Sequence, residues 1–210
     1  MTELILVRHS QPHSGVADPG LTPQGVELAR AAARWLAHDT VDVVLSSPLR
    51  RAMETAAPIA AALGLRVESF DGLLEWEAVP PRPHYIRLEE VGLEHPANRA
   101  LHEGRYEDFR PLGFDEAAFV AGAKVALDEI FARWPVERIV AVAHGGIINA
   151  MIASVLEPRD GFFFFMPGYT GISIVERVPA GRTVVRTLND TGHLLGERRP
   201  GTTRPTVLDG

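Results

Sequence analysis

Leu4-Ile5-Leu6-Val7-Arg8-His9, close to the start of the chain, joins a continuous apolar run to two basic residues. A short apolar run without alternating polar residues predicts a strand buried on both faces, as the strands of parallel sheets are. Similar runs occur at 41–45 and 138–143, and segments of helical period separate them. Because strands that alternate with helices indicate an α/β fold, we predict a three-layer sandwich with a mainly parallel central sheet and helices on both faces.

The remaining segments fit this architecture. Helices are predicted from Thr22-Pro23 onward, from Ser47-Pro48 to Ala62, over 115–134, and from Gly145 to about residue 156. The apolar stripe of the first helix is expected at Leu28, Ala31, Ala32, Trp35 and Leu36. Short strands are expected at 66–68, 171–177 and 182–188, the last two as a hairpin. Residues 1–195 are interpreted as one domain with an insertion at about 76–113, followed by a loosely held tail at 196–210.

Composition excludes several classes of protein. The 210 residues carry a net charge of −6, which argues against a nucleic-acid-binding protein. The absence of cysteine excludes disulfides, thiolate metal sites and cysteine nucleophiles. No signal peptide and no apolar run long enough to span a membrane is evident, so we expect a cytoplasmic protein without membrane contact. Arginine supplies 20 of the 21 basic residues and alanine is frequent, which suggests a bacterial source.

Basic and imidazole side chains gather where the predicted strands end. Arg8-His9 follows the first strand, Arg50-Arg51 follows the second, and His144 follows a later one. Ligands of such folds bind at the carboxyl ends of the strands, so these groups are expected to meet at one edge of the sheet. Guanidinium groups match phosphate oxygens, and helix N-termini at Ser47 and Gly145 are expected to add partial positive charge. The sequence therefore predicts a phosphate-binding site.

Five stretches, in this order, resemble the motifs of the histidine phosphatase superfamily, also called the phosphoglycerate mutase-like family. They are Leu6-Val7-Arg8-His9-Ser10, the segment from Ser46 to Ala56, Leu73-Leu74-Glu75, Val142-Ala143-His144-Gly145-Gly146, and the segment from Leu188 to Leu194. The resemblance implies that His9 is a nucleophile that becomes phosphorylated and that Glu75 is the general acid. It also implies that Arg8, Arg51 and His144 hold the phosphoryl oxygens.

Some assignments have competitors. Arg50 and Arg51 lie about 100° apart on a helix, so they cannot both face one pocket, and the family pattern selects Arg51. Glu77 lies two residues from Glu75 and is an alternative acid. Ser10 stands where the family usually has glycine, so the loops around the leaving group do not identify the substrate.

We therefore predict a metal-independent phosphatase of the histidine acid type that hydrolyses phosphomonoesters of small metabolites and needs no cofactor. The substrate-binding residues are expected to be Arg8, Ser10, Arg51, His144 and Gly145, and the catalytic residues His9, Glu75, Arg8, Arg51 and His144. A phosphoglycerate mutase and a catalytically silent phosphate-binding module are the alternatives. The sequence leaves open whether the chain forms a homodimer.

Overall fold

The structure, a computed structural model, describes residues 1–76, 85–87, 90, 92, 94–96, 99–100, 103, 105, 113–159 and 161–195. Most of the predicted insertion at 76–113 and all of the predicted tail at 196–210 therefore lie outside the described residues. So does Glu77, the alternative acid.

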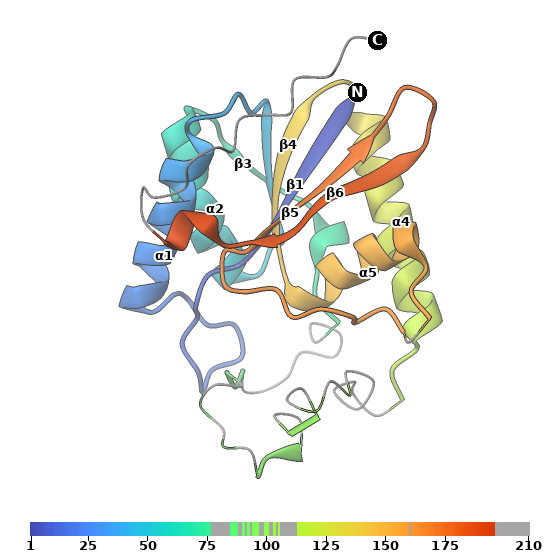
Figure 1. The fold of residues 1–210 in the computed structure, drawn as a ribbon. Coiled ribbons are helices and arrows are strands. Elements are labelled where there is room, and N and C mark those ends of the chain that lie inside the picture. Colours follow the sequence, from blue (N-terminus) through green and yellow to red (C-terminus); the bar gives the residue numbers. More distant parts are fainter. Residues whose placement is uncertain are drawn as a thin grey trace.

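A six-stranded sheet forms the centre of the molecule, in the order β3-β2-β4-β1-β5-β6 (Figure 1). Neighbouring strands from β3 to β1 run parallel, whereas β5 and β6 are antiparallel to their neighbours. The sheet is thus mainly parallel, as predicted, and its last two strands form the predicted hairpin. The strands are β1 Thr2–Arg8, β2 Val43–Ser46, β3 Val67–Ser69, β4 Arg138–Ala143, β5 Ile172–Arg177 and β6 Thr183–Asp190.

Helices cover both faces of the sheet, which confirms the three-layer prediction. On one face lie α1 (Pro23–Leu36) and α2 (Arg50–Leu63), and on the other lie α4 (Glu116–Arg133) and α5 (Gly145–Leu156) (Figure 1). Within β1, Leu4 and Leu6 join the core beneath α4 and α5, while Ile5 and Val7 join the core beneath α1 and α2. The strand is continuously apolar because both of its faces are buried.

The buried face of α1 differs from the predicted stripe. The buried residues are Gly25, Ala29, Ala32, Ala33 and Leu36, whereas Leu28, Ala31 and Trp35 are only partly buried. Gly25 lies so close to the carbonyl oxygen of Gln11 that a Cβ atom would overlap with it. Because of this close approach, α1 packs mainly through its small residues. A pattern based on large apolar side chains does not detect such a face.

The predicted cap at Ser47 is wrong. Helix α2 begins at Arg50, after an N-cap residue, Leu49, that makes no side-chain cap hydrogen bond. The Ser47 hydroxyl lies instead 2.8 Å from Nε2 of His144 and forms a hydrogen bond with it at the carboxyl edge of the sheet. By contrast, Thr22 caps α1 as predicted, because its hydroxyl accepts from Gly25 N–H at 2.9 Å.

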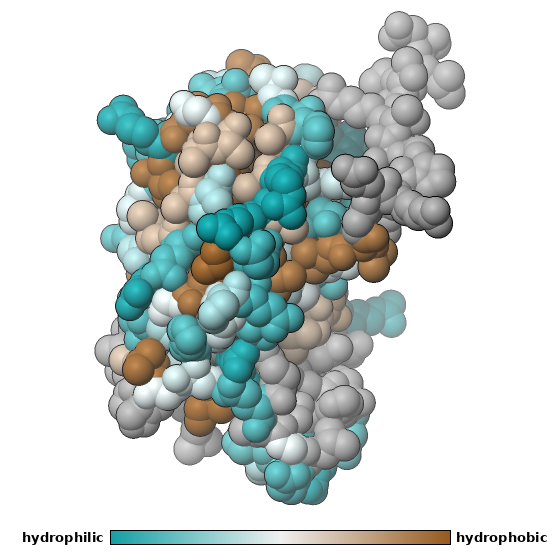
Figure 2. Space-filling model, turned by 90° about the vertical axis from the view of Figure 1, so that its left-hand side faces the viewer, coloured by the Kyte–Doolittle hydropathy of each residue, from teal (hydrophilic) through white to brown (hydrophobic). Residues whose placement is uncertain are grey.

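The outer surface of α1 is polar. Its exposed residues include Gln24, Glu27, Arg30 and Arg34, spaced three or four apart. Viewed from the side of α1 and α2, Figure 2 shows hydrophilic side chains interspersed with apolar ones. Among the described residues, no helix is long and apolar enough to cross a membrane.

Candidate active site

The predicted cluster assembles at the carboxyl ends of three adjacent strands. Arg8 pairs with Ala143 across β1 and β4, and Ser46 pairs with Val142 across β2 and β4. The residues that follow, among them His9 and His144, therefore leave the sheet side by side. The ring centroids of these two histidines are 5.1 Å apart.

Three hydrogen bonds hold His9, which is 2% exposed. Its backbone N–H donates to the carbonyl oxygen of Ala143 at 2.8 Å. Its Nδ1 lies 2.7 Å from the carbonyl oxygen of Ser10, which can only accept, so Nδ1 carries the proton. Nε2 consequently holds a lone pair, which accepts a hydrogen bond from Nε of Arg51 at 3.3 Å.

Ser10 holds this arrangement in place. Its N–H donates to the Thr55 hydroxyl at 2.9 Å, and its hydroxyl donates to the carbonyl oxygen of Gly25 at 2.6 Å. The Thr55 hydroxyl in turn donates to the carbonyl oxygen of Arg51 at 2.7 Å. Ser10 thus links β1 to both α1 and α2, and its predicted contact with substrate stays a prediction.

The two neighbouring arginines of α2 have different environments. Arg51 is 3% exposed and lies beside His9, and its Nη1 is 4.0 Å from Asp18 Oδ1. Arg50 is exposed, and its Nε donates to Glu54 at 2.7 Å. The structure therefore brings Arg51 to the cluster and leaves Arg50 outside it, in agreement with the helical geometry.

Two buried nitrogen atoms in the cluster have no hydrogen-bond partner among the described residues. They are Nε of Arg8 and Nδ1 of His144. Arg8 donates through Nη1 to the carbonyl oxygen of Pro167 at 2.5 Å, and His144 contacts Ser47 through Nε2. Because buried polar atoms are nearly always paired, these two positions suit the oxygens of an anionic ligand.

Both histidines are held neutral. Burial, followed by the charges of Arg51 and Arg8, lowers the pKa of His9 well below 6.5, against a raising effect of the Ser10 hydrogen bond. Burial, followed by Arg51, His9 and Arg8, does the same to the pKa of His144. At neutral pH the cluster therefore combines two guanidinium charges with two uncharged imidazoles.

Glu75 lies against the start of α5, at Gly146, two residues after His144. This side chain is 8% exposed; its Oε2 accepts from Gly146 N–H at 2.8 Å, and its Oε1 accepts from Trp76 N–H at 3.0 Å. A Cβ atom at residue 146 would overlap with Oε1, so glycine is required for this approach. Gly145 forms the first turn of α5, with Arg8 Nε and Phe163 near its own Cβ position.

Two tyrosines that the sequence analysis missed flank His9. The Tyr85 ring lies 4.8 Å from Cζ of Arg51, and the Tyr169 ring lies 4.5 Å from Cζ of Arg8. Their centroids are 6.4 and 6.1 Å from that of His9. Each ring lies against one of the two guanidinium groups, a contact favoured by the negative face of the aromatic ring.

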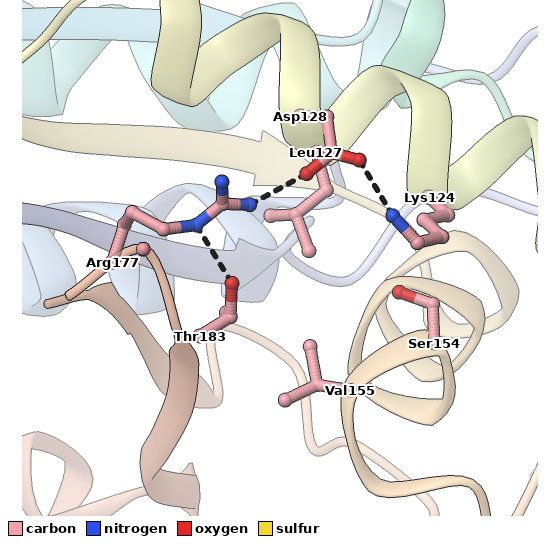
Figure 3. Close-up of a pocket in the computed structure, with 8 residues that line it drawn as sticks. Lys124, Leu127, Asp128, Ser154, Val155, Arg177 and Thr183 are labelled. Carbon is pink, nitrogen blue, oxygen red and sulfur yellow. Dashed lines mark hydrogen bonds and ion pairs between the residues drawn. The ribbon is translucent and has the colours of Figure 1, made fainter.

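A second pocket in the described part of the chain lies away from the histidine cluster. A pocket of about 510 Å³ lies between α4, α5 and the β5–β6 hairpin (Figure 3). Its cations, Lys124 and Arg177, both pair with Asp128, and Arg177 also donates to Thr183. Arg177 pairs with Thr2, at the end of β1 opposite Arg8, so this pocket is separate from the cluster. Within the described ranges, no group of three or more His, Asp or Glu residues could hold a metal ion.

The chain is similar to proteins of one known family. A sequence profile of the histidine phosphatase superfamily (branch 1) matches residues 4–191. Phosphoserine phosphatase 1 of Hydrogenobacter thermophilus is 30% identical over an alignment that covers 92% of this chain and 95% of that protein. A 2,3-bisphosphoglycerate-dependent phosphoglycerate mutase of Methylobacterium radiotolerans is 32% identical, over 86% of this chain and 92% of that protein.

Solved structures agree with the sequence comparisons. Phosphoserine phosphatase of Entamoeba histolytica is 27% identical and has a TM-score of 0.71, with 92% of this chain and 100% of that one covered. Its structures include a histidine-to-alanine variant with phosphoserine and a complex with 3-phosphoglyceric acid. The profile match spans nearly the whole chain and includes every residue of the cluster, so this chain belongs to the histidine phosphatase superfamily.

Proposed function

We propose that the protein is a phosphatase that hydrolyses phosphomonoesters of small metabolites through a phosphohistidine on His9. The observation that carries the proposal is the state of His9: a neutral, buried imidazole that has its proton on Nδ1 and whose Nε2 lone pair accepts from Nε of Arg51. An imidazole nucleophile needs such a lone pair, and a phosphoryl group needs the surrounding positive charge.

In the first step, the Nε2 lone pair of His9 attacks phosphorus, and the bond between phosphorus and the ester oxygen breaks. Arg8, Arg51 and the Nδ1 of His144 stabilise the charge on the three transferring oxygens. Glu75 gives its proton to the leaving oxygen, which departs as an alcohol. Two backbone N–H groups, those of Gly146 and Trp76, hold the Glu75 carboxyl group in place.

In the second step, water attacks the phosphohistidine. Glu75, now a carboxylate, takes a proton from this water, and the bond between phosphorus and Nε2 breaks. The electron pair returns to Nε2, and inorganic phosphate leaves. Neither step requires a metal ion, because guanidinium groups supply the positive charge. The cycle restores Nε2 and the protonated acid.

The relatives support a small substrate that carries a carboxylate. Two proteins similar to this chain are phosphoserine phosphatases, and one of these was solved with phosphoserine and with 3-phosphoglyceric acid. Phosphoserine is therefore the first substrate to test. A mutase is the second candidate, because a phosphoglycerate mutase is 32% identical to the chain. A mutase passes the phosphoryl group to a second hydroxyl instead of water.

The test measures phosphate release from phosphoserine and from p-nitrophenyl phosphate, with EDTA present, by wild type and His9→Ala. The proposal predicts chelator-resistant turnover that His9→Ala abolishes. A parallel assay supplies 3-phosphoglycerate with a bisphosphate primer. Isomerisation faster than phosphate release would assign the mutase, and unchanged turnover by His9→Ala would refute the phosphohistidine.

A further inference from the structure

We propose that Asn189 and His193, both in the segment from Leu188 to Leu194, are positioning residues that orient the Arg8 side chain toward the phosphoryl group. They act through the loop formed by residues 166–171, called here the Arg8 loop. The inference rests on the proposed function insofar as Arg8 binds phosphoryl oxygens. Neither residue belongs to the cluster around His9.

The Arg8 loop contacts Arg8 along its backbone and along its side chain. Arg8 N–H donates to the carbonyl oxygen of Gly171 at 3.1 Å, and Thr170 N–H donates to the carbonyl oxygen of Arg8 at 3.0 Å. The guanidinium donates through Nη1 to the carbonyl oxygen of Pro167, and the ring of Tyr169 lies 4.5 Å from its Cζ. The direction of the guanidinium therefore depends on the conformation of this loop.

Asn189 holds the loop at the peptide that Arg8 uses. Its Oδ1 accepts from Gly168 N–H at 2.8 Å, and its Nδ2 donates to the carbonyl oxygen of Met166 at 3.2 Å. The Gly168 N–H and the Pro167 carbonyl are opposite ends of one planar peptide unit. Because that unit is rigid, fixing its N–H fixes the direction of the carbonyl that receives Arg8 Nη1.

His193 holds the other end of the loop. Thr170 is fully buried and has a φ of +57°, a conformation that is costly for a residue with a branched side chain. Its hydroxyl donates to the carbonyl oxygen of Tyr169 at 2.7 Å and lies 2.9 Å from His193 Nε2. Since the hydroxyl proton is already used, Nε2–H of His193 is the donor in this pair. His193 thus stabilises the strained residue whose N–H binds the backbone of Arg8.

The decisive variant is Asn189→Gly. Asn189 has a φ of +49°, which glycine adopts freely, so the backbone is kept and only the side chain is removed. Thr183→Val is the matched control, because it removes a side-chain hydrogen bond to Arg177 at the opposite end of the same hairpin. His193→Gln, which keeps an N–H donor, is compared with His193→Leu, which does not.

The measurement is the affinity for orthovanadate by titration calorimetry, in the wild-type background and in Arg8→Ala. We expect Asn189→Gly to weaken binding about tenfold, as the loss of one or two buried hydrogen bonds permits, and Thr183→Val to leave it unchanged. His193→Gln should bind more tightly than His193→Leu. In the Arg8→Ala background, Asn189→Gly should cause no further loss, because the two residues act through one guanidinium.

Equal losses in both backgrounds, or wild-type affinity of Asn189→Gly, would overturn the inference. Because orthovanadate binding needs no turnover, this measurement is independent of the phosphatase assay. A wild-type protein that binds orthovanadate but releases no phosphate contradicts the proposed function alone. A wild-type protein that does not bind orthovanadate contradicts both.

Discussion

Replacing Gly146 by alanine tests the role of Glu75 without replacing the side chain of Glu75 or that of His9. The new methyl group would overlap with Oε1 of Glu75, which must retreat by roughly 1 Å to reach a normal contact distance. The same shift weakens the 2.8 Å hydrogen bond from Gly146 N–H to Oε2. His9, Arg51 and His144 keep their own partners, so the phosphate-binding groups stay in place.

The size of the effect should depend on the leaving group. A displacement of about 1 Å can cost about 100-fold in rate, and a positioned acid contributes about 100-fold or more. Serine leaves as a strongly basic alkoxide and needs the proton, so kcat/KM for phosphoserine should fall about 100-fold. p-Nitrophenolate leaves without a proton, so its turnover should fall only a few-fold.

Gly122→Ala, in α4, is the matched control. A Cβ atom there meets no other atom within 4 Å, and both substitutions replace a helical glycine by alanine and gain similar helix propensity. Steady-state kinetics on both substrates, for both variants, is the assay. An equal loss on the two substrates, or no loss on phosphoserine, would refute the assignment of Glu75 as the acid.

Three further predictions follow from the same geometry. Arg51→Gln should lower kcat/KM at least 100-fold in steady-state kinetics, whereas Arg50→Gln should change kcat/KM little. In urea denaturation, Arg50→Gln should lower the free energy of unfolding by at most about 1 kcal/mol. Thr55→Val leaves the buried Ser10 N–H unpaired and should cost about 1–3 kcal/mol in urea denaturation, while Thr55→Ser should restore most of this. Burial keeps the pKa values of His9 and His144 in the folded protein below 6.5, so below pH 6.5 these histidines bind protons in the unfolded chain but not in the native state. The free energy of unfolding should therefore fall as the pH drops from 6.5 toward the folded pKa values. The expected slope is up to about 1.4 kcal/mol per pH unit for each histidine. Denaturation at pH 7 and 5.5 should show this slope, and His9→Asn should reduce it; equal stability at the two pH values would contradict the neutral state of both histidines.

The sheet and the position of the cluster could be predicted because they depend on local patterns. Strands buried on both faces are continuously apolar, as in β1 and β4, and parallel strands bring their carboxyl ends to one edge. His9 and His144 come directly after such strands, and Arg51 lies in the helix that follows β2, so the topology brings the three together. Helical geometry indicated that Arg50 and Arg51 cannot both face one pocket, and the family resemblance selected Arg51.

The features that were missed depend on tertiary contacts. The face of α1 is set by the approach of Gly25 to Gln11, and the Ser47 hydroxyl binds an imidazole from another strand instead of capping a helix. Tyr85 and Tyr169 lie in segments without periodicity, and only folding brings them to the two arginines. The sequence holds a weak signal for Tyr169, because this residue lies two positions before the strand predicted at 171–177.

If His9 is the nucleophile, its Nε2 carries the phosphoryl group during turnover, and this can be tested by trapping the phosphoenzyme and locating the phosphate on the ring. Rapid acid-free quenching during turnover of phosphoserine, followed by phosphorus NMR and peptide mass spectrometry, distinguishes phosphate on Nε2 from phosphate on Nδ1. We expect phosphate on Nε2 of His9, because Nδ1 donates its proton to the carbonyl oxygen of Ser10. Phosphate on Nδ1, phosphate on another residue, or rapid turnover without any phosphoenzyme would contradict it.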